Sequence, residues 1–187
     1  MIRAFLAIRP SEEVLRNLAE AQKELAGCGA DARWVPPEAM HLTVQFLGDV
    51  REAEIPELER GLGERLRGIE PFELECRGFG VFPNQKRPRI VWVGLFGAGL
   101  SEVAEIVETV LSPLGFPPQE QEFSPHITLG RLRSARGVEG LVRIVKGSGG
   151  RTFGTSRIDH VTLYRSVLHP DGAVYTPVLE LPLGGAS

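Results

Sequence analysis

The sequence contains little cysteine and no excess of basic charge, and each shortage argues against a class of protein. Two cysteines, Cys28 and Cys76, occur among the 187 residues. They form neither a CxxC pair nor a zinc-ligand spacing, which argues against a disulfide-rich secreted scaffold and a zinc domain. The formal net charge is −3, so a broad, nonspecific nucleic-acid surface is not expected, although a small, local basic site is compatible with it.

The chain also lacks long apolar runs and several common enzyme motifs. The apolar stretch in residues 1–8 is too short for a signal peptide or a membrane span. No G-x-S-x-G, H-E-x-x-H or Walker loop is present, so the corresponding hydrolase and nucleotide-binding classes have no support. We therefore expect a cytoplasmic protein with reduced thiols and no membrane segment.

The pattern of apolar residues predicts an antiparallel α+β fold. The order of elements is β-α-β-β-α-β-β-α-β-α-β-β. Helices are expected at residues 11–27, 55–69, 100–114 and 138–145. Strands are expected at residues 2–8, 33–35, 41–48, 72–82, 90–93, 126–132, 158–167 and 174–181. With hydrophobic residues at 42% and no low-complexity linker, one domain spanning residues 1–187 with two facing sheets is expected.

One short pattern, histidine–apolar–threonine–apolar, carries the chemistry. It occurs in His41-Leu42-Thr43-Val44 and again in His126-Ile127-Thr128-Leu129. Because side chains alternate along a strand, each histidine shares a face with its threonine, and the apolar residues form the opposite face. Two such polar faces lining one cleft would supply two proton-transfer groups and two hydroxyl donors, which suits cleavage of a phosphodiester without a metal.

A third copy, His160-Val161-Thr162-Leu163, shows that the bare pattern has little specificity. His41 and His126 each follow a proline-bearing loop, whereas His160 falls inside the expected strand 158–167 with no break before it. We interpret His160 as a strand histidine that is hydrogen-bonded or half exposed. For His41 and His126, spacing alone leaves a structural and a catalytic role equally open.

Two aromatic residues near the first motif are candidates for stacking on a nucleobase. By strict alternation Phe46 lies on the apolar face with Leu42 and Val44, which favours a packing role. Trp34 lies in a loop-like stretch before Pro36-Pro37 and is expected to be more open.

In their surroundings the two motifs resemble the signature of the 2H phosphoesterase superfamily. More closely, the chain is similar to its RNA 2′,3′-cyclic phosphodiesterase branch, also called 2′-5′ RNA ligases. The matching stretches are IRAFLAI, RWVPPEAMHLTVQFLGDV, SPHITLGRL and LYRSVLHPDGAVYTPV. The resemblance implies a bilobal α+β fold in which two antiparallel sheets from duplicated lobes face a central cleft, with helices outside. The resemblance also implies that the third copy of the pattern, at His160, is not part of the family signature.

The resemblance also implies roles for particular residues. His41 would be the proton donor and His126 the proton acceptor, and Thr43 and Thr128 would bind the nonbridging phosphate oxygens. The product would be a 2′-phosphate, and no metal or other cofactor is expected. Arg131 would add a cation for the phosphate. Strict alternation places Arg131 on the face opposite His126, so this role requires a bend at Gly130, and a solvated surface arginine is the alternative.

The expected substrate is RNA with a 2′,3′-cyclic phosphate end, such as a tRNA-like fragment, and reversible 2′-5′ ligase activity is a family property. We expect a monomer with no membrane partner. Two alternatives stay open: a 2H enzyme acting on another cyclic nucleotide or a 2′-5′ oligonucleotide, and a non-catalytic RNA-binding module. Turnover distinguishes the enzymes from the binding module, and product analysis distinguishes the substrates.

Overall fold

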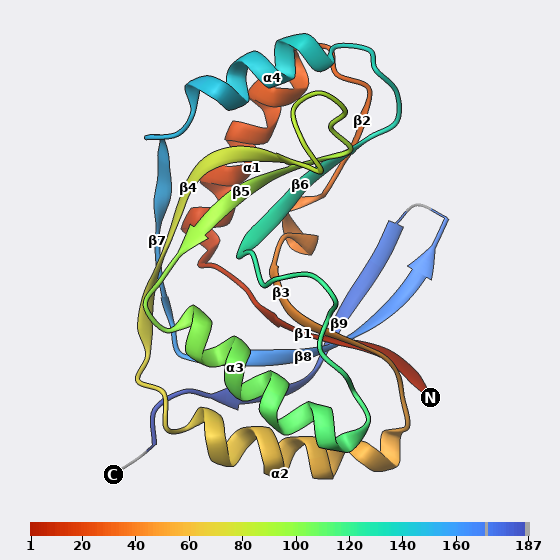
Figure 1. Ribbon diagram of the computed structural model, residues 1–187, viewed down its shortest axis with the longest axis vertical. Helices are drawn as coiled ribbons and strands as arrows, with labels where there is room; N and C mark the ends of the chain where they lie inside the picture. The colour runs from red at the N-terminus through yellow and green to blue at the C-terminus, as the bar shows by residue number, and fades with distance from the viewer. Residues whose placement is uncertain (171, 186–187) are drawn as a thin grey trace.

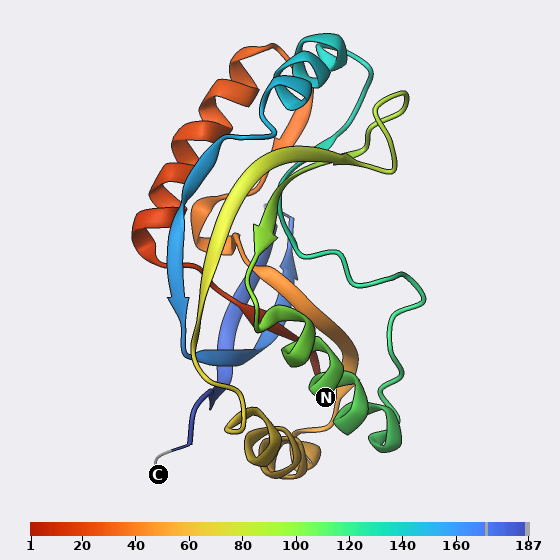
Figure 2. The same cartoon turned by 60° about the vertical axis from the view of Figure 1, so that its left-hand side comes forward.

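The computed structural model describes residues 1–170 and 172–185 and contains a single curved antiparallel sheet with helices on its outside (Figures 1 and 2). The strands are β1 Ile2–Ile8, β2 Ala32–Trp34, β3 Leu42–Val50, β4 Phe72–Phe82, β5 Ile90–Phe96, β6 His126–Leu132, β7 Thr152–Ile158, β8 His160–His169 and β9 Gly172–Pro182. The helices are α1 Glu12–Gly27, α2 Ile55–Leu66, α3 Leu100–Leu111 and α4 Val138–Gly147, and short 3₁₀ turns cover 37–39, 52–54 and 112–114.

The sheet has two halves that meet at β3 and β6. Its strand order is β7-β4-β5-β6-β3-β1-β8-β9, and β2 pairs with β6. Figure 1 shows α1 and α4 together over the half that contains β4 to β7, and α2 and α3 together over the other half. The α+β class with antiparallel strands and outer helices is thus confirmed, and the two expected sheets are the two halves of one continuous sheet.

Each helix forms where apolar spacing and end signals agree. In α1, Ser11 is the N-cap and its Oγ accepts a hydrogen bond from the Val14 amide at 3.3 Å. The apolar side of α1 is buried, and the polar Gln22 interrupts it with a structural purpose. The Gln22 Nε2 donates to the carbonyl oxygens of Val35 and Leu129 at 2.7 and 2.8 Å. Gln22 therefore links the segment before the first motif to the second motif.

The C-terminal strands differ from the expectation. The expected strand 158–167 is the junction of two strands, since β7 ends at Ile158 and β8 begins at His160. The pattern missed β7 because its sequence, TFGTSRI, buries only Phe153, Ser156 and Ile158 and contains Gly154 at φ +116°. The expected hairpin is present, with His169 paired to Gly172, whereas Asp171 of the turn signal lies outside the described residues. None of the described helices is long and apolar enough to cross a membrane.

Trp34 packs on a glycine, and this contact fixes β2 against β6. Trp34 is paired with Gly130, and a Cβ on Gly130 would lie 2.7 Å from the indole ring. The ring is partly buried against the core, so the expectation that Trp34 is open to a nucleobase is wrong. Trp34 and Gly130 lie on the core face of the sheet, where Gln22 of α1 reaches the neighbouring Leu129 carbonyl.

We expect Gly130→Ala to destabilise the protein by about 1–3 kcal/mol, because the added methyl group forces the indole of Trp34 to move. Gly147→Ala is the matched control, since a Cβ at Gly147 meets no atom within 4 Å, and its effect should stay within about 0.5 kcal/mol. Urea unfolding at neutral pH measures both values. Equal stability of the two variants would show that Trp34 does not close on Gly130.

Candidate active site

A single residue pair brings the two His-x-Thr motifs together. Leu42 on β3 pairs with Ile127 on β6, and these side chains are 1% and 0% exposed. Opposed residues of an antiparallel ladder share a face, and their sequence neighbours point to the other face. The two histidines and two threonines therefore lie on the face opposite the core, and each of the four is partly exposed, as alternation predicts.

Both imidazoles are held in the same way. The Nδ1 of His41 lies 2.7 Å from the carbonyl oxygen of Ala39, and the Nδ1 of His126 lies 2.6 Å from that of Ser124. A carbonyl oxygen only accepts hydrogen bonds, so Nδ1 carries the proton in each ring and Nε2 is left to accept or donate. The acceptors come from the loops that contain Pro36-Pro37 and Pro125. In the sequence, the same proline-bearing loops distinguish His41 and His126 from His160.

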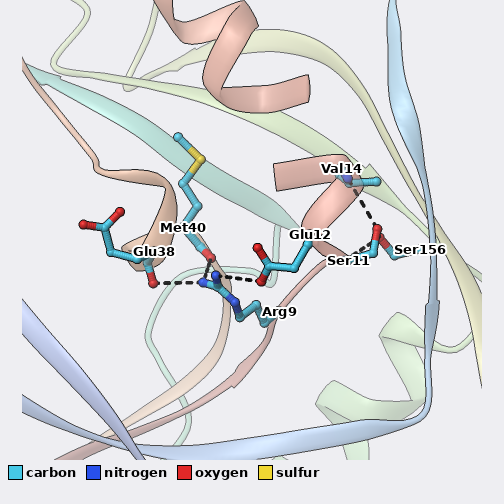
Figure 3. A network of polar contacts seen from close by, with 7 residues as sticks. All are labelled: Arg9, Ser11, Glu12, Val14, Glu38, Met40 and Ser156. Atoms are coloured by element: carbon cyan, nitrogen blue, oxygen red, sulfur yellow. Dashed lines mark hydrogen bonds and ion pairs between the residues drawn. The ribbon is translucent and has the colours of Figure 1, made fainter. Parts of the chain in front are cut away.

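The loop before His41 is anchored by an arginine that the sequence pattern did not single out. The Arg9 Nη1 donates to the carbonyl oxygen of Glu38 at 2.8 Å and lies 3.5 Å from that of Met40 (Figure 3). Its Nη2 donates to the Glu12 carboxylate at 3.3 Å. Arg9 directly follows β1, and this position at the end of a strand was the sequence signal that could have indicated its role near His41. It fixes the turn that presents the Ala39 carbonyl to His41.

Aromatic rings enclose the two histidines from different strands. The ring centroids of Phe5 and Tyr175 lie 4.8 and 5.1 Å from that of His41. Those of Phe82 and Trp92 lie 4.9 and 6.0 Å from that of His126. A hollow of about 210 Å³ adjoins His41 and is lined by Phe5, Tyr164 and Tyr175 among others. No local pattern in the sequence marks these aromatic residues as part of the site, although Tyr164 and Tyr175 lie in the stretch LYRSVLHPDGAVYTPV.

Burial changes the chemistry of His41. Loss of hydration lowers the pKa of the His41 imidazole to about 4, the hydrogen bond to Ala39 opposes this change, and the positive charge of Arg9 adds to it. The free protein therefore holds His41 neutral at pH 7. Its Nε2 lies 3.1 Å from the Thr43 Oγ1. A neutral Nε2 can accept the hydrogen bond that this hydroxyl donates.

A bulge after each threonine turns one further side chain, Phe46 or Arg131, onto the face that carries the histidines. In the pairing of β1 with β3, Leu6 opposes Gln45 and Ala7 opposes Thr43, so Val44 is the extra residue. Gln45 is buried at 4% exposure and Phe46 is 60% exposed. The expectation that Phe46 packs in the core is therefore wrong, because strict alternation fails at the bulge.

The same bulge occurs in the second motif. In the pairing of β5 with β6, Val91 opposes Gly130 and Trp92 opposes Thr128, so Leu129 is the extra residue. Arg131 opposes Ile90, which is two residues from Trp92 and shares its face. The exposed Arg131 thus lies on the face of His126 and Thr128. The bend that its expected role requires is present next to Gly130.

His160 does not join the two motifs. It lies at the start of β8, where its Nδ1 is 2.6 Å from the Asp159 carboxylate and its side chain is 44% exposed. Its ladder partner is Pro182 on β9, away from the β3–β6 junction. The interpretation of His160 as a half-exposed, hydrogen-bonded histidine agrees with this position.

We expect His41→Gln to weaken the loss of stability in acid. The unfolded chain takes up a proton at His41 near pH 6.5, whereas the folded protein does so only near its lowered pKa of about 4. Stability is therefore lost as the pH falls from about 6.5 to about 4. The wild type should lose on the order of 3 kcal/mol more than His41→Gln over this window in urea titrations. Parallel curves for the two proteins would contradict the desolvation of His41.

Comparison with known proteins places this geometry in a family. Residues 8–92 and 96–175 match the family model of the LigT like phosphoesterases. The chain is 37% identical to a protein of Aeropyrum pernix named RNA 2′,3′-cyclic phosphodiesterase, over 88% of this chain and 94% of that protein. It is 35% identical to one of the same name from Methanothermobacter thermautotrophicus, over 94% and 95%. A crystal structure from Thermus thermophilus superposes over the full length of both chains with a TM-score of 0.81 and 32% identity. The chain belongs to the LigT-like 2H phosphoesterase family.

Proposed function

We propose that this protein is an enzyme that hydrolyses the 2′,3′-cyclic phosphodiester at the end of an RNA chain to a 2′-phosphomonoester. The observation that carries the proposal is the pair of histidines on one face of the sheet, each with Nδ1 bound to a carbonyl oxygen, which leaves Nε2 as the proton-transfer atom. The family and the names of the relatives from Aeropyrum and Methanothermobacter support an RNA cyclic phosphate as the substrate.

The reaction needs one proton taken up and one delivered. The Nε2 of His126 removes a proton from a water molecule as the water oxygen bonds to phosphorus. The bond between phosphorus and the 3′ oxygen breaks, and the Nε2–H of His41 protonates the departing 3′ oxygen. The phosphate stays on the 2′ oxygen. His126 then holds a proton and His41 has lost one, so exchange with solvent restores the starting state.

The proton on His41 arrives with the substrate. In the free protein the lowered pKa keeps this ring neutral at pH 7. A phosphodiester anion beside the ring favours the charged imidazole, because an opposite charge raises the pKa of a cationic acid. The aromatic enclosure by Phe5 and Tyr175 strengthens this attraction, since charges interact more strongly where water is excluded. We propose that binding and protonation of His41 are coupled.

The hydroxyls and one arginine stabilise the charge that develops on phosphate. Thr43 and Thr128 share the face of the histidines, and their hydroxyls donate to the nonbridging oxygens. Arg131, turned to this face by the bulge at Leu129, supplies a permanent cation. Phe46, turned by the matching bulge, offers an exposed ring on which a base can stack.

We further propose how the enzyme works in the cell. The same groups serve a 2′-5′ ligase reaction, in which a 5′-hydroxyl replaces water as the nucleophile and loses its proton to His126. The P–O3′ bond again breaks and a 2′-5′ linkage forms.

We propose that residues 1–187 act as one monomeric domain in the cytoplasm, where the free Cys28 and Cys76 stay reduced. The substrates include tRNA-like fragments that end in a cyclic phosphate, and the chemistry requires no metal or other cofactor.

We expect His41→Ala and His126→Ala each to lower kcat/KM by about 10²–10⁴-fold, because each removes one proton-transfer group. The measurement is hydrolysis of a short RNA with a 2′,3′-cyclic phosphate end in the presence of EDTA, with the product isomer identified. His160→Ala is the matched control and should retain wild-type turnover, since His160 starts β8 away from the junction.

Three outcomes would overturn parts of the proposal. A 3′-phosphate product would reverse the assignment of the leaving oxygen. If EDTA abolished the activity and added metal restored it, the reaction would require a metal ion. Tight RNA binding with no turnover by the wild type would make the protein a binding module.

A better leaving group should distinguish the acid from the base. In a cyclic phosphorothiolate with sulfur at the bridging 3′ position, the departing thiolate needs little protonation, because a thiol has a pKa of about 8.5. We expect the defect of His41→Ala to shrink to about tenfold or less on this substrate, whereas His126→Ala stays as impaired as on the oxygen substrate. Rescue of His126→Ala instead would exchange the two roles.

A further inference from the structure

Two arginines oppose each other at the edge of the catalytic face. Arg33 on β2 is the ladder partner of Arg131 on β6, and both are exposed. Ladder partners share a face. Trp34, the neighbour of Arg33, covers Gly130 on the core face, so Arg33 points to the opposite face, as Arg131 does.

This pairing is unfavourable in the free protein. Like charges directly opposite each other on neighbouring strands destabilise a sheet. Within residues 1–170 and 172–185, neither arginine forms an ion pair with an acidic side chain. Two guanidinium groups that repel each other here would be stabilised by an anion placed between or beside them.

The Arg33 side chain reaches the start of β9, the strand that carries Tyr175. A Cβ on Gly172, the first residue of β9, would lie 3.2 Å from an Nη atom of Arg33. Tyr175 lies three residues, or roughly 10 Å, further along β9 and contacts the His41 ring. Arg131 lies a similar distance beyond Thr128 on β6. The two arginines thus add two cations to the face of the sheet that carries the histidines and threonines of both motifs.

We propose that Arg33 binds the phosphodiester that joins the terminal nucleotide of the RNA to the nucleotide before it. Arg131 then serves the reacting phosphate, and Arg33, one strand further out, serves the next one. This assignment rests on the proposed RNA cyclic phosphodiesterase activity. It makes Arg33 a specificity-determining residue, because a cyclic mononucleotide has no second phosphate for it to bind. The enzyme therefore favours RNA chains over free 2′,3′-cyclic mononucleotides.

The test compares two substrates that differ by one phosphodiester. kcat/KM is measured for uridine 2′,3′-cyclic phosphate and for the dinucleotide UpU with a 2′,3′-cyclic phosphate end. We expect the wild type to favour the dinucleotide and Arg33→Gln to lower this selectivity about tenfold, the size of one lost hydrogen bond to a charged group. Arg60→Gln, at an exposed arginine on α2 of the other half, is the matched control and should retain the selectivity.

A neutral linkage identifies the group that Arg33 binds. With a methylphosphonate between the two uridines, the wild type should lose the same factor that Arg33→Gln loses on the natural dinucleotide. For Arg33→Gln, replacing the natural linkage by the methylphosphonate should lower kcat/KM little further. If Arg33→Gln lowers kcat/KM equally for the mononucleotide and the dinucleotide, Arg33 has a purely structural role and the inference is overturned. The inference is also overturned if the variant and the methylphosphonate lower kcat/KM independently of each other.

Binding keeps this test separate from the proposed function. The affinity of the wild type and of Arg33→Gln for UpU with a 2′-phosphate end is measured by titration. If the wild type hydrolyses neither substrate, the proposed activity fails. The role of Arg33 in binding the phosphodiester is then still supported if Arg33→Gln binds the natural linkage more weakly than the wild type does but binds the methylphosphonate equally well.

Discussion

The pairing of Leu42 with Ile127 is the contact that brings the polar faces of the two motifs together. It joins the two halves of the sheet at the centre of both motifs, and both side chains are fully buried in the shared core. Because ladder partners share a face, burying these two apolar residues forces the polar residue on each side of them outward. The hydrophobic effect at this one crossing therefore assembles the four polar groups, with no direct bond between the two histidines.

Enclosure of His41 sets the electrostatics of the site. The Phe5 and Tyr175 rings exclude water, and Arg9 holds the loop that supplies the Ala39 carbonyl while its positive charge opposes protonation. An imidazole held neutral in this way takes up a proton when a phosphate anion makes its charged form favourable. In the proposed mechanism the desolvation that lowers stability in acid therefore also couples protonation of His41 to binding of the phosphate.

Local patterns in the sequence predicted the helices, most strands and the polar face of each motif, because these follow from periods of 3.6 and 2 residues. They could not predict that Phe46 and Arg131 lie on the same face as the histidines. One extra residue in a bulge reverses alternation, and Val44 and Leu129 look like ordinary strand residues. The contact of Tyr175 with His41 was also out of reach, since it depends on how β9 folds back across the sheet.

The two motifs are alike in backbone and different in surroundings, and in the proposed mechanism this difference gives each histidine a separate role. Each has a histidine bound to a carbonyl two residues earlier, a threonine, and a bulge one residue later. The bulge presents an aromatic ring, Phe46, in one motif and a cation, Arg131, in the other. A symmetric pair of strands can hold a phosphate from both sides, but hydrolysis needs one proton donor and one acceptor. In the proposed mechanism that asymmetry comes from the surroundings, since the hydrogen bond of His41 is part-buried and that of His126 is exposed.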